Sequence, residues 1–229
     1  MADSTLMTIP VYQLGPLAIS GTVITTWVVM LLLGVVAWLF TRRLRREPGS
    51  SQTAVEGVVA TIEAAVREVA PQHAQLILPF VGSLWVYIVV ANLIGLIPGL
   101  HSPTRDLSAT AALAFLVFLS VHWYGIRSQG LKNYLRHYLS PSPILLPFHI
   151  ISEISRTVAL AVRLFGNIMS LEMAALLILL VAGFLAPVPI LMLHIVEALV
   201  QAYIFGMLAL IYLAGGIQSQ QLRQQPQKE

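Results

Sequence analysis

Five long apolar stretches constrain the fold of this chain more than any other feature. A helix that crosses the roughly 30 Å hydrocarbon core of a membrane needs about 20 mainly apolar residues, and each stretch is long enough. Hydrophobic residues make up 57% of the chain and charged residues only 10%, which excludes an ordinary soluble domain. The sequence therefore predicts an all-α polytopic membrane protein with five transmembrane helices. The stretches are Gly21 to Phe40, Leu76 to Pro98, Leu107 to Ile126, Ile144 to Ala182 and Val188 to Gly216.

We expect residues 1–229 to form a single membrane domain. Its predicted last part, 144–217, is a long hairpin that turns at Pro187-Val188-Pro189. At 1.5 Å per residue, a helix over the fourth stretch would be about 58 Å long, nearly twice the thickness of the membrane core. That helix must therefore tilt strongly, kink or break. The other predicted parts are a first span at 17–41, a surface helix at 53–70, and the second and third spans within 76–127.

Lys and Arg gather on one side of the predicted membrane. Ten of the thirteen basic residues follow the first span, follow the third span or lie in the C-terminal tail. Such residues favour the cytoplasm, so we expect the N-terminus outside and the C-terminus in the cytoplasm. The first apolar run is too long for a signal peptide and ends in the basic run Thr41–Arg46, so we expect a retained span. Outside, Arg105 stands beside Asp106, its simplest partner.

A short amphipathic helix is predicted between the first two spans. Valines recur there at helical spacing from Val55 to Val69, next to polar positions. Thr53 and Glu56 form a possible capping box at its start, and Pro71 marks its end. This helix lies either on the cytoplasmic membrane surface or against the protein itself.

A polar face runs along the fourth stretch and contains Arg163. An arginine at membrane depth costs from ~3 to ~10 kcal/mol or more unless it faces water or a partner. The first three spans offer no carboxylate within the membrane, so we expect the counter-charge of Arg163 on another chain. Residues at steps of four and three share one helix face, and six of these seven are polar. They are His149, Glu153, Arg156, Leu160, Arg163, Asn167 and Ser170.

The fifth stretch carries a second polar face with His194, Glu197 and Gln201. Counted from the hairpin turn, Glu172 and His194 lie at similar depth, so we expect them to meet. An imidazole changes charge near neutral pH, which makes such a pair a plausible proton relay. The alternative for Glu197 and Gln201, each taken singly, is a polar link between helices worth about 0.6 kcal/mol.

Three further polar residues have a plainer interpretation. Glu153 and Arg156 are three positions apart and would neutralise one another near the cytoplasmic interface, where His149 is also expected. Asn92 precedes a turn rich in Pro and Gly, and would satisfy backbone or hairpin partners.

Other classes of protein fit the sequence less well. A secondary transporter, which stays a remote alternative, would show repeated halves and helices broken at mid-membrane. An intramembrane hydrolase would need a nucleophile beside a base or a motif such as HExxH, and His149 and His194 lack those neighbours. There is no P-loop and no cysteine. We therefore expect no catalytic site, no cofactor, no metal site and no nucleic-acid partner, with membrane lipid as the surroundings.

Several motifs together resemble subunit a of the membrane (Fo) sector of F-type ATP synthases. The run Arg163–Asn167, RLFGN, is similar to the family's signature around its essential arginine, and Glu172 falls where the family often carries a channel acid. His194 and Gln201 match the pattern of its last helix. The resemblance covers Leu76 to Leu213. Further matching runs are Thr104–Ala111, Ser152–Arg156 and Ala202–Phe205.

The resemblance implies the function of an ion-channel stator that couples ion flow to rotary ATP synthesis or hydrolysis. The implied partners are an oligomeric c-ring, the peripheral-stalk subunit b and the other subunits, in a bacterial plasma (inner) membrane. Arg163 would face the ring carboxylates and separate two aqueous half-channels. The outer one would be lined by Glu172, His194 and Gln201, with Asn167 setting Arg163, and the inner one by Glu153 and His149. Further possible lining residues are Ser170, Asn92 and Glu197.

Two positions depart from the family pattern. Many members have an acidic residue at the place of His149, and the position of Glu197 is usually apolar. The N-terminal region is short, which resembles a variant branch to which sodium pumping has been ascribed. The resemblance thus implies proton transport by prevalence, with a sodium-translocating variant of the same complex as the alternative.

Overall fold

The computed structural model describes residues 11–14, 17–42, 49–97, 100, 102–130, 146–182 and 188–218. Within these residues, five helices are long and apolar enough to cross a membrane, which confirms the predicted all-α polytopic class. A sixth helix, α2 (Ser50–Val69), follows the first of them. The five are α1 (Gly21–Arg42), α3 (Ala74–Leu93), α4 (Leu107–Gln129), α6 (Leu146–Ala182) and α7 (Val188–Gln218).

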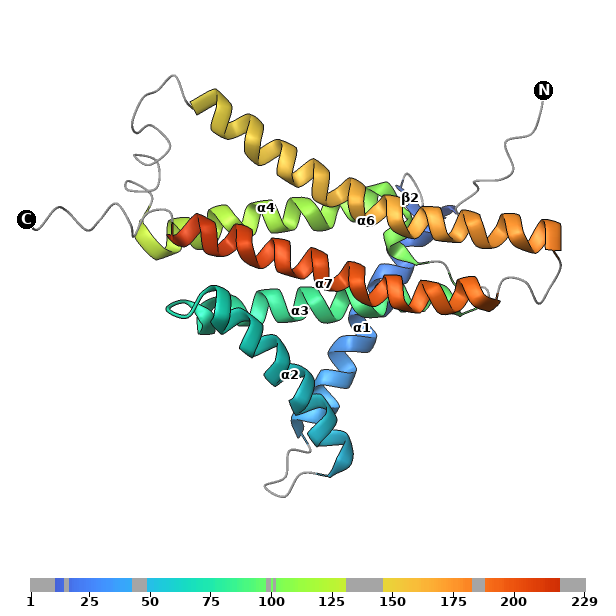
Figure 1. Cartoon of the computed structure of the whole chain (residues 1–229), viewed down its shortest axis with the longest axis horizontal. Coiled ribbons are helices and arrows are strands. Elements are labelled where there is room, and N and C mark those ends of the chain that lie inside the picture. Colours follow the sequence, from blue (N-terminus) through green and yellow to red (C-terminus); the bar gives the residue numbers. More distant parts are fainter. Residues whose placement is uncertain are drawn as a thin grey trace, which may run out of the picture.

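Helices α3, α4 and α7 lie side by side along the long axis of the molecule, and α6 packs on α4 and α7 (Figure 1). Helices α1 and α2 form a V that projects from one side of this bundle. The core contains buried apolar residues of α3, α4, α6 and α7, including Ile88, Leu164 and Phe205, each fully buried. In α1 the one buried residue is Val29, so nearly all of its apolar surface faces outward.

Helix α6 is continuous over 37 residues, a length of about 55 Å. Its N-terminal half diverges from the bundle, whereas the rest runs beside α7 (Figure 1). Of the three predicted outcomes, tilting, kinking or breaking, a break is excluded. The following helix begins at Val188, so Val188 and Pro189 belong to α7 rather than to the predicted turn. Proline is tolerated there because the first turn of a helix needs no donor from it.

Helix α2 begins four residues earlier than the predicted capping box requires. Its N-cap is Gly49, which makes no side-chain cap, so the capping box is wrong. Thr53 instead donates from Oγ1 to the carbonyl of Gly49, and Glu56 accepts from Gln52. The C-terminal half of α2 packs against the protein, because Val66 is buried in the core, whereas the valines of its N-terminal half are exposed. A position on the membrane surface stays a prediction for that exposed half.

The connection from α3 to α4 contains two short 3₁₀ helices, η2 (Ile94–Leu96) and η3 (Pro103–Arg105). At the other end of the described chain, β1 (Val11–Leu14) and β2 (Leu17–Ser20) pair antiparallel, with Val11 opposite Ser20. This strand pair was not predicted, and it occupies the start of the predicted 17–41 segment. The basic run after Arg42, the loop with Lys132 and Arg136 and the tail with Arg223 and Lys228 lie outside the described residues.

Candidate functional site

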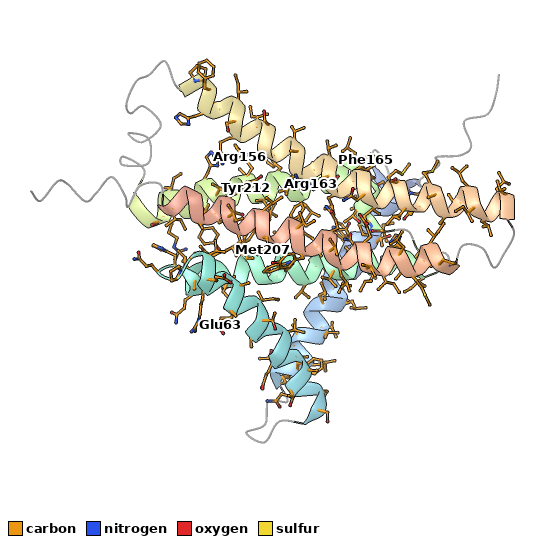
Figure 2. All side chains as sticks on the ribbon, in the orientation of Figure 1. Glu63, Arg156, Arg163, Phe165, Met207 and Tyr212 are labelled. Atoms are coloured by element: carbon orange, nitrogen blue, oxygen red, sulfur yellow. The ribbon has the colours of Figure 1, made fainter. Side chains whose placement is uncertain are left out.

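Arg163 lies on the exposed side of α6, near the middle of the bundle (Figure 2). Its neighbours Leu160 and Leu164 are buried, because they fall on the face that packs into the core. Arg163 lies outside that buried face and is exposed, as is its neighbour Val162. In the described part of the chain its guanidinium has no ion pair or hydrogen bond. This charge is therefore available to a group outside the chain.

Asn167 and Gln201 join α6 to α7 one helical turn from Arg163. Nδ2 of Asn167 donates to Oε1 of Gln201 at 2.7 Å. Gln201 is 1% exposed, and its Nε2 has no hydrogen-bond partner among the residues that the structure describes. The structure thus brings together two of the predicted site residues and leaves a buried amide donor beside them.

His194 and Glu197 lie further along the same side of α7. His194 is buried and its Nε2 has no partner, whereas Glu197 is half-buried. No direct hydrogen bond joins His194 to Glu172 among the described residues, so their meeting across the hairpin stays a prediction. Glu172 lies about 180° around α6 from Arg163, so the two side chains face different surroundings.

Glu172 pairs instead with Arg105 of η3. Nη1 of Arg105 donates to Oε2 of Glu172 at 3.0 Å, and the side chains are 30% and 15% exposed. The simplest partner of Arg105 in the sequence was Asp106, and that prediction is wrong. The sequence offered one signal of the true pair: Arg105 is the basic residue isolated on the outer side, close in depth to the acid of α6.

Asp106 has a different role, as the N-cap of α4. Its Oδ1 accepts from the backbone N and the Oγ of Ser108, both at 2.9 Å, and its Oδ2 accepts from Thr22 of α1 at 3.0 Å. Partial burial acts to raise the pKa of Asp106, but these hydrogen bonds outweigh it and hold the pKa below its usual value. Asp106 is therefore a carboxylate at neutral pH.

A buried polar network links the C-terminal end of α3 to η3 and α7. Thr104 donates from Oγ1 to Oδ1 of Asn92 at 2.8 Å, and Nδ2 of Asn92 donates to the carbonyl of Ala198 at 3.3 Å. Ser102 donates to the carbonyl of Ala91 at 2.8 Å. Asn92 thus bonds to a hairpin backbone group, as predicted. The sequence did not single out Ser102 or Thr104, although hydroxyl residues beside proline often bond locally.

The residues in the N-terminal part of α6 are more open. His149 is exposed and Glu153 is half-buried. The guanidinium of Arg156 lies over the ring of Tyr212 at 5.4 Å from its centroid (Figure 2), a contact that the sequence did not indicate. The predicted pairing of Arg156 with Glu153 is wrong, since no ion pair joins these two described residues. Ser170, further outward, is exposed.

Comparisons with known proteins agree with this arrangement. The family model of the ATP synthase A chain matches residues 23–214. The chain is 67% identical over 218 residues to ATP synthase subunit a 2 of Pelobacter propionicus, covering 95% of this chain and 96% of the relative. It is 68% identical over 206 residues to ATP synthase subunit a 1 of Hahella chejuensis, covering 90% and 88%. With ATP synthase subunit a of Legionella pneumophila the identity is 58% over 215 residues, covering 93% and 94%.

These matches cover nearly the whole length of the chain and of its relatives, and they include all five membrane-length helices. The same segments contain Arg163, the Asn167–Gln201 pair and the Arg105–Glu172 pair. The chain belongs to the subunit a family of F-type ATP synthases, and is a multi-pass, non-catalytic membrane subunit of the ion-transporting Fo sector.

Proposed function

We propose that this subunit passes protons through two aqueous half-channels to and from the carboxylates of a c-ring, and so couples proton flow to rotary ATP synthesis or hydrolysis. The observation that supports this most is the exposed Arg163, which has no partner in the described residues. A charge at that depth costs several kcal/mol unless it meets water or an opposite charge, roughly 3 kcal/mol at the least. A ring carboxylate on another subunit supplies that opposite charge.

Arg163 acts on the ring carboxylates through its fixed positive charge. An opposite charge within about 4–6 Å favours the ionised form of a carboxylate. A ring carboxylate must therefore release its proton before it passes Arg163, and it takes up another afterwards. The same charge repels a cation that would cross directly from one half-channel to the other, so the two remain separate.

The outer half-channel is formed by Glu172, His194 and Gln201, with Asn167 beside Arg163. Two buried nitrogens without partners, Nε2 of His194 and Nε2 of Gln201, support the presence of water there. Buried polar groups that lack a protein partner are commonly bonded to ordered water. Further lining residues are Asn92, Ser170 and Glu197.

The inner half-channel is formed by Glu153 and His149, which lie on the part of α6 that diverges from the bundle (Figure 1). The side chain of His149 is exposed at this end, which supports access of water from the cytoplasm. We place the subunit in a bacterial plasma membrane, with the N-terminus outside and the C-terminus in the cytoplasm. The subunit assembles there with the c-ring, the peripheral-stalk subunit b and the other subunits.

Arg163→Ala in the complete ATP synthase tests this function. We expect ATP-driven acidification of inverted membrane vesicles to be lost, while the amount of assembled complex stays near that of the unchanged protein. Arg156→Ala is the matched control, because Arg156 is an exposed arginine two turns away whose guanidinium lies over an aromatic ring. It should retain most of the pumping. Normal coupled pumping by Arg163→Ala would show that the proposal is wrong.

The coupling ion is tested on the same vesicles. For a proton channel, acidification is abolished by a protonophore and does not depend on added Na⁺. ATP hydrolysis stimulated by Na⁺, with ion uptake that resists the protonophore, would instead identify the sodium-translocating variant.

A further inference from the structure

The ion pair between Arg105 and Glu172 links η3 to α6 near the outer end of the bundle. Nη1 of Arg105 and Oε2 of Glu172 are 3.0 Å apart, and both side chains are largely shielded from solvent. Among the described residues the other ion pair, Arg67 with Glu63, lies within α2. Salt screens partly buried charges only a little, so the positive charge of Arg105 attracts the Glu172 carboxylate strongly.

The two oxygens of Glu172 have different surroundings. Oε2 is held by Arg105, whereas Oε1 has no hydrogen bond in the described part of the chain. A Cβ added to Gly95 would lie 3.7 Å from Oε1 and 3.1 Å from Cβ of Ser102. Glycine therefore keeps the space beside Oε1 open. One oxygen is fixed in place and the other is free to accept a proton.

The groups around Glu172 make Arg105 the dominant positive charge there. The elements that pack around Glu172 bring two further carboxylates, those of Asp106 and Glu197. Arg105 is the one arginine or lysine among the described residues of these elements that surround Glu172. The outer half of α4, Leu107–Ser120, has no titratable side chain. His101 lies outside the described residues. The titratable groups are Arg105 and Asp106 at η3, Tyr87 on α3, and His194 and Glu197 on α7.

Resting on the proposed function, we propose that Arg105 is a positioning residue for proton uptake: it holds Glu172 through Oε2, presents Oε1 to the outer half-channel, and keeps protonation of Glu172 brief. An arriving proton forms an O–H bond at Oε1 as the water that carried it gives it up. Inward transfer breaks that bond and restores the carboxylate. Arg105 stays bonded to Oε2 throughout, so Oε1 keeps its place while the proton enters and leaves.

A purely structural role makes a different prediction. If the pair did no more than fasten η3 to α6, its loss would reduce the amount of assembled complex or its rate. It would not change the outer proton concentration at which transport is half-saturated. The half-saturating concentration, measured separately from the maximum rate, therefore distinguishes the two roles.

The test uses the complete ATP synthase in proteoliposomes, with the membrane potential set by potassium and valinomycin. The rate of ATP synthesis is measured against pH on the side of the outer half-channel. We expect Arg105→Gln to lower the half-saturating proton concentration about tenfold, because a neighbouring opposite charge shifts a carboxylate by about one to three pH units. The maximum rate falls as well, since Glu172 then releases its proton slowly. Arg105→Lys keeps the charge and stays close to the unchanged protein.

Three results would overturn the inference. The first is a fall in rate by Arg105→Gln with an unchanged half-saturating concentration, and the second is an equal shift by Arg105→Lys. The third is a further shift when Arg105→Gln is added to Glu172→Gln, because the effect must act through that carboxylate. Arg163→Ala measured in parallel separates this inference from the proposed function: coupled synthesis in that variant refutes the function, whereas the results above refute only the role of Arg105.

Gly95→Ala provides an independent variant if Arg105→Gln does not assemble. It places a methyl group 3.7 Å from Oε1 and 3.1 Å from Cβ of Ser102, and it changes neither partner of the ion pair. We expect the maximum rate of synthesis to fall in an assembled complex. An unchanged rate would show that Oε1 is not the accepting atom, and the inference would be wrong.

Discussion

Asn167 on α6 donates a hydrogen bond to Gln201 on α7, 2.7 Å long, one helical turn along α6 from Arg163. This bond fixes the two long helices to each other beside the exposed arginine. It also uses the amide oxygen of Gln201 and leaves the buried Nε2 without a partner. The surroundings of Arg163 are thus rigid on one side and open to water or another subunit on the other.

We expect Gln201→Leu to slow ATP-driven pumping several-fold. The change leaves the amide of Asn167 without its acceptor, which costs about 1–3 kcal/mol for a polar group away from water. If the two residues act as a unit, Asn167→Leu added to Gln201→Leu slows pumping no further. Pumping is measured in inverted vesicles and normalised to the amount of assembled complex. Additive losses in the double variant would show that the residues act independently.

His194→Leu should slow pumping and change its dependence on pH, because it removes an imidazole that can take up and release a proton. The buried Nε2 of His194 has no protein partner and is available to pass a proton through water. His122→Leu is the matched control, since Nδ1 of His122 contacts the carbonyl of Phe118 within α4 at 2.8 Å. An unchanged pH dependence of pumping in His194→Leu would show that His194 contributes only to packing.

Asp106→Ala should destabilise the subunit by about 1 kcal/mol, the usual contribution of an N-cap. The change also removes the acceptor of Thr22, which ties α1 to the start of α4. The pKa of Asp106 is lowered in the folded protein, so this stabilisation is fully present above the ordinary aspartate pKa and is lost as pH falls through the lowered one. Thermal unfolding in detergent at neutral and acidic pH measures both effects. The difference between Asp106→Ala and the unchanged protein should shrink at the acidic pH.

The helices could be predicted from the sequence because each depends on a local pattern. Apolar runs of sufficient length end at Pro, Gly or charged residues, and the observed ends of α1 and α4 lie within three residues of those predicted. The polar face of α6 was also readable, since helical spacing alone places Asn167 on the same side as Arg163. The strand pair β1–β2 escaped prediction because two four-residue strands carry too little pattern.

The Arg105–Glu172 pair could not be predicted in the same way. Its partners are 67 positions apart, and their contact depends on how η3 folds beneath α6. Sequence reasoning favoured the adjacent Asp106, but that carboxylate already accepts hydrogen bonds as a helix cap. Asp106 can either cap α4 or pair with Arg105. Tertiary structure decides between the two, because α6 brings Glu172 within reach of Arg105.

Gly206→Ala should weaken the packing of α3 against α7 by about 1–3 kcal/mol, as expected for a methyl group forced into a filled space. A Cβ at Gly206 would lie 2.6 Å from Nε1 of Trp85, and that ring cannot easily move because it is buried and stacks on Tyr203. We expect a lower thermal unfolding midpoint in detergent. Gly215→Ala on the same helix is the control, since nothing lies within 4 Å of its Cβ, and it should be neutral or slightly stabilising. Trp85→Phe should restore part of the loss in Gly206→Ala by making room. Equal thermal unfolding midpoints for Gly206→Ala and Gly215→Ala would show that the packing of α3 against α7 accommodates the added methyl group without loss of stability.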